Sequence, residues 1–168
     1  MSQNLPLATV SGRLTERDRD TSIAQNMFVT MTTAGQVFGV PVLQVQDVLG
    51  AQRITRVPLA PPEVAGSLNL RGRIVTSIDV RTRLGLSPRP SNMPGMNVVV
   101  DLDGELYSLI VDKVGEVMSL SEVDYERNPT TLEARWREVS DGIYRLRDGL
   151  LIVLDIARLI PQPRETVA

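Results

Sequence analysis

The sequence predicts an all-β protein built from two copies of one small barrel module, and two observations support this prediction. Hydrophobic residues make up 42% of the chain but aromatic residues only 4%, so the core must consist mainly of Val, Leu and Ile. Val and Ile, together with Thr, are stiff at the first side-chain torsion and suit pleated strands. The chain also contains an internal repeat, which predicts the same order of strands and turns in both halves.

The repeat consists of two blocks. A shift of 69 positions places residues 27–48 on residues 96–117, and a shift of 76 places residues 70–84 on residues 146–160. The difference of seven residues falls in the variable stretch between the blocks, where loops tolerate insertions. Because turns, apolar runs and an acidic residue recur in the same order, we interpret the chain as a duplicated module.

The ordered part of the chain is predicted to span residues 25–160 as a single domain with two subdomains, about 25–86 and about 96–160. Residues 1–24 are polar, charged and aperiodic and predict a flexible tail, as do residues 161–168. The stretch 87–95 holds three prolines and a glycine, which predicts a connection. The longest apolar run, Leu150–Leu154, is too short to cross a membrane, and the N-terminus lacks an apolar segment of signal-peptide length. We therefore expect a cytoplasmic protein.

Each module is predicted to contain four or five strands. The apolar runs 28–32 and 98–102 are followed by Ala34-Gly35 and Asp103-Gly104, and Asp148-Gly149 precedes the run 150–154. Asp-Gly between apolar runs is a strong hairpin signal, because both central residues of such a turn need positive φ. Strands that follow one another without helical crossovers indicate two small closed barrels.

Short helical turns are expected at three places. Asp79 and Asp155 end the last strand of each module, and an aspartate there can cap the free N–H groups of a short helix. Residues 131–139 are compatible with a third short helix between strands of the second module.

Composition also bears on chemistry. The chain has no His and no Cys, which removes the usual catalytic triads and most zinc sites, so no metal site is predicted. A small barrel that binds nucleic acid is one alternative, but it needs a positive groove and stacking aromatics, whereas the net charge is −2 and the aromatics are scattered. An enzyme that uses carboxylates alone is another; it needs two acids facing one cleft, and capping already explains Asp79 and Asp155.

Four sequence motifs resemble the CheW family of chemotaxis coupling proteins. The block Asn69–Gly72, followed by an apolar strand and Ile78–Arg81, is similar to that family's NLRG…IDLR signature. The other three motifs are Phe38–Val42 with Val45–Val48, Val111–Val117, and Leu151–Asp155. The resemblance runs from about Met27 to Ile160. The sequence departs from the family pattern at Thr76, often proline, at Asp47, usually glutamate, and over residues 126–139, which match poorly.

The resemblance implies a fold of two SH3-like five-stranded β-barrels with short terminal helical turns, without catalytic activity or cofactor. It implies an adaptor that couples methyl-accepting chemoreceptors, through their cytoplasmic tips, to the regulatory domain of a CheA-type histidine kinase, which has the same double-barrel fold. Such an adaptor needs neither nucleic acid nor direct membrane insertion, because the receptor recruits it to a membrane-associated or cytoplasmic array. Arrays that control pili or biofilm formation use similar adaptors, and this alternative stays open.

The resemblance also implies a receptor-binding groove, because the receptor tips in such a system are helical hairpins. Helix-in-groove recognition needs an apolar floor and directional polar groups at the rim. The positions that match the family's groove are Val45, Asp47, Gly66, Asn69, Arg71 and Gly72. Purely structural roles are the alternatives: turn glycines, an Asn69 side chain that satisfies its own turn, a core Val45, and an internal ion pair of Arg71 with Asp47 or Asp79.

A kinase-binding surface is predicted less directly. Pairing of one barrel with another should use apolar side chains on loops or edge strands. The candidates are Ile74, Met96, Met118, Leu120 and Tyr125. For each of them, ordinary core packing is the alternative.

Overall fold

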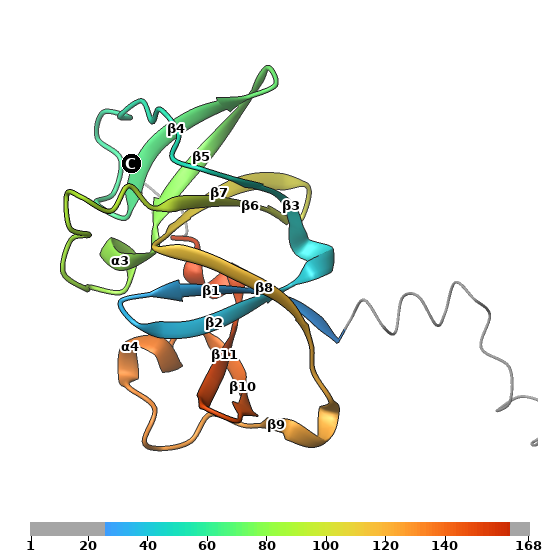
Figure 1. The fold of residues 1–168 in the computed structure, drawn as a ribbon. Coiled ribbons are helices and arrows are strands. Elements are labelled where there is room, and N and C mark those ends of the chain that lie inside the picture. Colours follow the sequence, from blue (N-terminus) through green and yellow to red (C-terminus); the bar gives the residue numbers. More distant parts are fainter. Residues whose placement is uncertain (1–25, 162–168) are drawn as a thin grey trace, which may run out of the picture.

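The computed structural model describes residues 26–161, so the predicted tails lie outside the described residues except for Pro161. The fold is mostly β with a few short helices, as predicted (Figure 1). The first half contains β1 (Met27–Thr33), β2 (Gln36–Pro41), η1 (Val42–Gln44), β3 (Val45–Leu49), β4 (Val64–Leu70), β5 (Arg73–Asp79) and α3 (Val80–Arg83). The second half contains β6 (Met96–Leu102), β7 (Glu105–Val111), β8 (Lys113–Ser119), η2 (Glu122–Asp124), β9 (Tyr125–Glu126), α4 (Ala134–Arg137), β10 (Ser140–Leu146), β11 (Gly149–Leu154) and α5 (Ile156–Leu159).

The strands form two sheets that do not coincide with the two sequence repeats. One sheet has the order β3-β6-β7-β5-β4, and the other has the order β8-β1-β2-β11-β10-β9. We call the first the central barrel, because its strands are continuous in the middle of the chain, and the second the terminal barrel. Each sheet takes one hairpin from the other repeat, β6–β7 in the central barrel and β1–β2 in the terminal barrel. Residues 87–95, which contain no helix or strand, therefore mark where the sequence repeats, not where one barrel ends.

The two sheets have equivalent strand orders. Under the repeat, β1 corresponds to β6, β2 to β7, β3 to β8, β4 to β10 and β5 to β11, so each order maps onto the other apart from β9. In both, one parallel pair joins the exchanged hairpin to the rest of the sheet, β5 with β7 and β11 with β2. Figure 1 shows the central barrel above the terminal barrel, with the β4–β5 hairpin projecting at the top.

The predicted closure of each barrel is not found as a complete ladder of hydrogen-bonded strands, because both strand orders are open. Two contacts bring the open edges near each other: β9, which follows β8, pairs with β10, and Thr55, which follows β3, forms a bridge with Ser67 of β4. A glycine in the φ +150° conformation lies at each crossing, Gly66 in β4 and Gly142 in β10. A Cβ at Gly66 would collide with the Thr55 carbonyl, and a Cβ at Gly142 with the Tyr125 ring. The segment that crosses the open edge of each barrel therefore needs a glycine beneath it.

Two of the predicted hairpin turns are confirmed. Both central residues have positive φ at Ala34-Gly35 (49° and 80°) and at Asp103-Gly104 (52° and 87°). The third hairpin differs by one residue from the prediction, because its turn is formed by residues 147–148 and Gly149 is already the first residue of β11.

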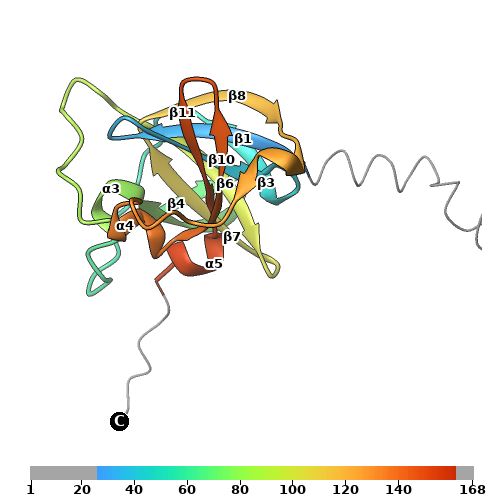
Figure 2. The ribbon, with the colours of Figure 1, turned by 90° about the horizontal axis from the view of Figure 1, so that it is seen from below.

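Both predicted helix caps are confirmed. The Asp79 carboxylate accepts a hydrogen bond from the Arg81 N–H at the start of α3, and Asp155 accepts one from the Arg158 N–H in α5. The third predicted helix, within residues 131–139, is α4. Figures 1 and 2 show α3 and α4 on the same side of the molecule, where Arg135 donates to the Gly85 carbonyl at 3.3 Å.

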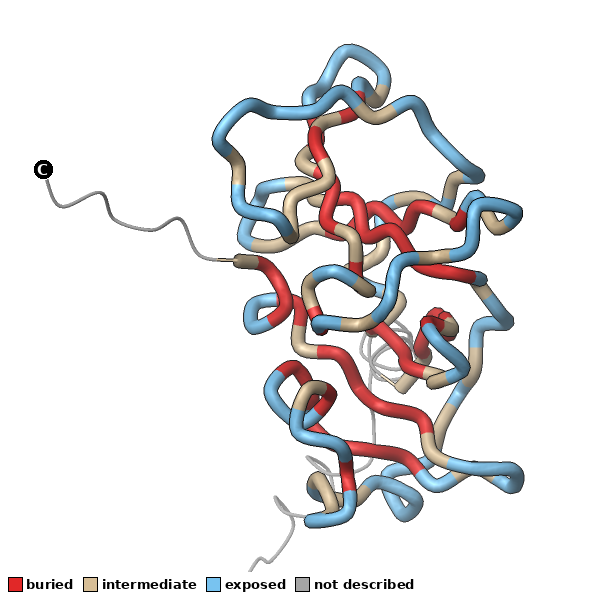
Figure 3. The backbone as a smooth tube through the Cα atoms, turned by 90° about the vertical axis from the view of Figure 1, so that its left-hand side faces the viewer, coloured by how far each residue is buried: buried red, intermediate tan, exposed pale blue. Residues whose placement is uncertain are grey.

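One large apolar cluster spans both barrels. It includes Phe38, whose ring lies 5.4 Å from that of Trp136, measured between centroids. A smaller cluster fills the terminal barrel. Its buried members are Phe28, Tyr144, Leu151 and Val153. Figure 3 shows the buried segments running through the middle of the molecule, with exposed loops around them.

Candidate partner-binding surface

The tip of the β4–β5 hairpin is the most exposed group of predicted receptor-binding residues. Arg71 and Gly72 form its two-residue turn, with φ of 51° and 84°. The Asn69 side chain accepts a hydrogen bond from the Gly72 N–H at 2.9 Å, so the turn is fixed without any contribution from the Arg71 side chain. The Arg71 side chain is 84% exposed.

Arg71 pairs with Asp47, one of the two internal partners that the sequence left open. The distance between Nη2 of Arg71 and Oδ2 of Asp47 is 3.5 Å. Asp47 lies at the bulge in β3, and its other oxygen accepts a hydrogen bond from the Val48 N–H. An exposed ion pair of this kind contributes only about 0.2–1 kcal/mol. Arg71 can therefore exchange Asp47 for a partner's carboxylate at little cost.

The other two groove candidates lie inside the fold. Gly66 is buried at the barrel crossing described above, and Val45 packs against the large core cluster. These contacts account for both residues by packing alone. The structure thus brings Asp47, Asn69, Arg71 and Gly72 together near the hairpin tip, whereas Gly66 and Val45 lie in the interior and not at this surface.

The five kinase-binding candidates fall into two groups on different barrels. Ile74, 80% exposed, lies opposite Asn69 in the β4–β5 ladder, and Met96, which begins β6, packs against the core. Met118 and Leu120 pack against the terminal-barrel cluster, and the Tyr125 hydroxyl donates to the Asp141 carbonyl at 2.7 Å. The five residues therefore do not form one patch, and Ile74 is the most exposed of them.

A buried ion-pair network was missed by the sequence reasoning, although its residues belong to the quoted motifs or to the predicted connection. Asp112, directly after β7, is 7% exposed. Its carboxylate accepts hydrogen bonds from Arg81 at 2.6 and 2.9 Å, from Arg89 at 2.9 Å and from the Ala34 N–H at 2.9 Å. Arg89 also lies 3.4 Å from Asp79. The network joins α3 and β7 of the central barrel to the β1–β2 turn of the terminal barrel.

The network shifts the acidity of its members. Burial acts to raise the pKa of Asp112, but hydrogen bonds from Arg81, Ala34 and Arg89 outweigh it and hold this pKa well below its ordinary value of 3.8. The hydrogen bond to Asp112 raises the pKa of Arg81. Asp79, Arg81 and Asp112, which belong to the sequence motifs, thus form ion pairs at the junction between the barrels.

The aromatic residues do not form a stacking surface for nucleobases. Four of the six, Phe28, Phe38, Trp136 and Tyr144, are buried, Tyr107 is partly buried, and Tyr125 is exposed. Within residues 26–161, no helix has the length and hydropathy needed to span a bilayer.

These features define a class of protein: a double β-barrel module whose exposed hairpins and loops are suited to binding other proteins. A family model described as "CheW-like domain" matches residues 27–164. The chain therefore belongs to the CheW-like domain family, a family of chemotaxis adaptor and scaffold proteins.

Several relatives are similar over most of their length. The chain is 27% identical over 133 residues to the chemotaxis protein CheW of Klebsiella aerogenes, covering 79% of this chain and 80% of that protein. It is 26% identical over 139 residues to the CheW of Treponema pallidum, covering 80% and 82%. Among solved structures, the scaffolding protein TtCheW from Thermoanaerobacter tengcongensis is similar, with a TM-score of 0.69 at 29% identity, covering 77% of this chain and 88% of that one.

Proposed function

We propose that this protein couples chemoreceptors to a CheA-type histidine kinase as a non-enzymatic adaptor, and that the β4–β5 hairpin is its receptor contact. The observation that carries the proposal is the geometry of Arg71, an exposed guanidinium at the tip of a turn that Asn69 already fixes. A guanidinium can bind a receptor carboxylate with two parallel hydrogen bonds. Membership of a scaffold family supports the adaptor role.

The kinase contact belongs on the same barrel in this proposal. Ile74 is the second residue of β5, two positions after Gly72, and its apolar side chain is exposed. An exposed large apolar residue beside a polar hairpin tip suits pairing with another barrel, because its burial stabilises the complex. Receptor and kinase would then meet on adjacent sides of the central barrel.

A titration with a matched control tests the receptor contact. Arg71→Asp reverses the charge and places at this position a residue that tolerates positive φ. We expect it to weaken binding of the receptor's cytoplasmic tip, measured by calorimetry, about tenfold or more, the loss typical of a charge-assisted contact. Arg147→Asp, at the equivalent turn of the terminal barrel, should bind like the wild type. Equal losses in both variants, or an Arg71→Asp protein that melts early by circular dichroism, would contradict the proposal.

A further inference from the structure

The loop before β4 holds an unusual turn. The Ala60 N–H donates to the Val57 carbonyl at 3.3 Å across Pro58 and Leu59, and Leu59 has φ of 63°. A turn with proline at its second position and positive φ at its third normally has Gly or Asn there. Leu59 therefore occupies a position that its side chain disfavours.

No contact within the described fold explains why a leucine occupies this position. The Leu59 side chain is fully exposed, and Val57 beside it is also exposed. Backbone strain and an exposed large apolar side chain both cost stability, so the combination indicates a function. A projecting leucine on a loop stiffened by three prolines loses little entropy when a partner binds.

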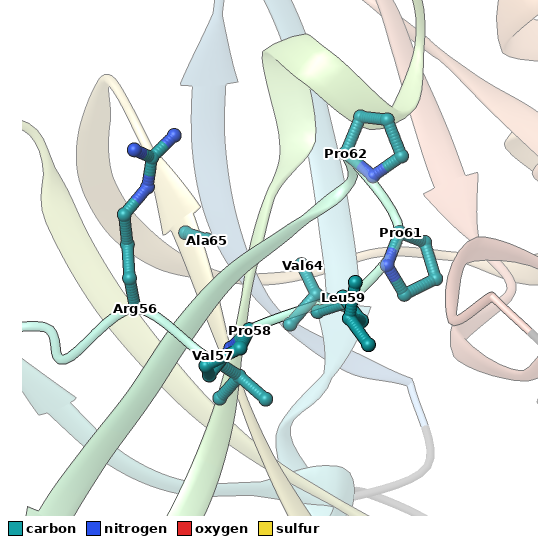
Figure 4. Close-up of a pocket in the computed structure, with 9 residues that line it drawn as sticks. Arg56, Val57, Pro58, Leu59, Pro61, Pro62, Val64 and Ala65 are labelled. Carbon is teal, nitrogen blue, oxygen red and sulfur yellow. The ribbon is translucent and has the colours of Figure 1, made fainter.

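The surroundings define the chemistry of that partner. The loop lines a pocket of about 500 Å³ between Arg56 at one end and Pro61 and Pro62 at the other (Figure 4). Arg56 is the only charged residue in the lining; the nearest acid in the sequence, Glu63, lies between Pro62 and Val64 but does not line the pocket. The pocket is thus suited to an apolar side chain accompanied by a carboxylate.

The prolines also exclude one mode of binding. Pro58, Pro61 and Pro62 have no N–H, so the loop cannot add a strand from a partner through a regular ladder. Recognition must then use side chains, as when a helix packs against a surface.

The position of the loop fits a pair of helices. It lies at the opposite end of β4 from Arg71 (Figure 1), and seven residues of strand span about 23 Å. Two antiparallel helices packed side by side are about 20 Å wide. One helical hairpin can therefore reach both ends of the strand.

We propose that the Leu59 loop is a second anchor for the receptor's helical hairpin, receiving a helix that carries an apolar side chain and a carboxylate about one turn apart. The proposal rests on the receptor contact at Arg71 and adds a site at the other end of β4.

The test uses the full chain, the receptor's cytoplasmic tip and two variants. Leu59→Asn removes the apolar side chain but suits positive φ, so the fold should be at least as stable as the wild type. Val123→Asn is the matched control, because Val123 is 87% exposed on η2 of the terminal barrel. We expect Leu59→Asn to weaken tip binding about tenfold, as for loss of a buried leucine contact, and Val123→Asn to leave it unchanged.

Three further outcomes show whether the receptor is the partner that binds the Leu59 loop. If Leu59→Asn instead weakens binding of the kinase regulatory domain, or of vesicles of phosphatidylcholine and phosphatidylserine, the receptor assignment is overturned. If the tip binds the wild type, Arg71→Asp weakens binding and Leu59→Asn does not, the Leu59 anchor alone fails. A wild-type protein that does not bind the tip overturns both proposals.

Discussion

The two barrels share one strand order but fill their interiors differently. In the terminal barrel, Phe28 and Val153 belong to the apolar cluster. The equivalent positions of the central barrel hold Asn97 and Ser77, both buried. Asn97 accepts a hydrogen bond from Ser108 at 2.9 Å and donates to the Gly50 carbonyl at 3.0 Å. The comparison shows that one strand order accepts an apolar interior in one barrel and a partly polar interior in the other. Asn97 and Ser108 hydrogen-bond to each other, whereas the buried Ser77 hydroxyl has no hydrogen-bond partner among the described residues.

Position 39 and its equivalent, position 108, show how the residues inside each barrel fit one another. In the terminal barrel Phe28 and Leu151 lie against Gly39, so that a Cβ at this glycine would be within 3.2 Å of both side chains. In the central barrel the equivalent residue is Ser108, which bonds to Asn97. A phenylalanine packed against a glycine is thus replaced by two polar side chains that hydrogen-bond to each other.

The largest effect should come from emptying the terminal barrel. Phe28→Ala removes a buried ring that packs 5.4 Å from Tyr144 between centroids. We expect it to lower the free energy of unfolding in urea by about 4 kcal/mol, through lost burial and a cavity. Asn97→Ala, at the equivalent position, should cost about 2 kcal/mol, because it leaves buried polar partners unsatisfied. Equal costs at the two positions would show that the interiors do not differ as described.

The junction between the barrels should respond to charge and to pH. Asp112→Asn leaves two arginines without their carboxylate, and we expect it to cost about 3 kcal/mol at pH 7. Asp103→Asn, on an exposed turn, is the control and should change stability by less than about 0.5 kcal/mol.

The sign of the pH dependence follows from the lowered pKa of Asp112. Because the folded state holds this pKa below the unfolded value of 3.8, the stabilisation is fully present above about pH 5 and is lost as the pH falls through and below 4. The difference between wild type and Asp112→Asn should therefore narrow between pH 6 and pH 3. A constant difference would show that the carboxylate charge is not what stabilises the junction.

The smallest difference between two paired variants is expected at the two glycine crossings of the barrels. A Cβ at Gly66 meets the backbone of Thr55, whereas a Cβ at Gly142 meets the ring of Tyr125, which can rotate away. We expect Gly66→Ala to cost about 3 kcal/mol and Gly142→Ala about half of that, since both also strain φ. The midpoints of urea unfolding measure the ratio, and a larger cost at Gly142 would contradict this account.

Much of the fold could be predicted because its signals are local. The turns at Ala34-Gly35 and Asp103-Gly104 and the caps Asp79 and Asp155 each depend on residues within a few positions of one another. The repeat added the equivalence of the strands. The predicted position of the third turn was wrong by one residue, because Gly149, with φ of +152°, is the first residue of β11 and not part of the turn.

The candidate site was predicted in part. Asn69, Arg71 and Gly72 share one turn, so their proximity follows from the chain itself. The Arg71–Asp47 contact joins two edges of the central barrel. Because these edges are far apart in the sequence, the sequence could predict it only as one of two possible ion pairs of Arg71. Leu59 carried no recognisable signal in the sequence, because its importance rests on its φ and its exposure.

The sequence by itself determined the all-β class, the duplication, the tight turns and the helix caps, since these follow from side-chain type and short-range spacing. Only the tertiary structure decided the exchange of the β1–β2 and β6–β7 hairpins, the ion pairs of Asp112 and the crossings over Gly66 and Gly142. Two equivalent hairpins can pair with either repeat without changing any local interaction. The choice between them is made by packing between segments far apart in the chain, which no local pattern records.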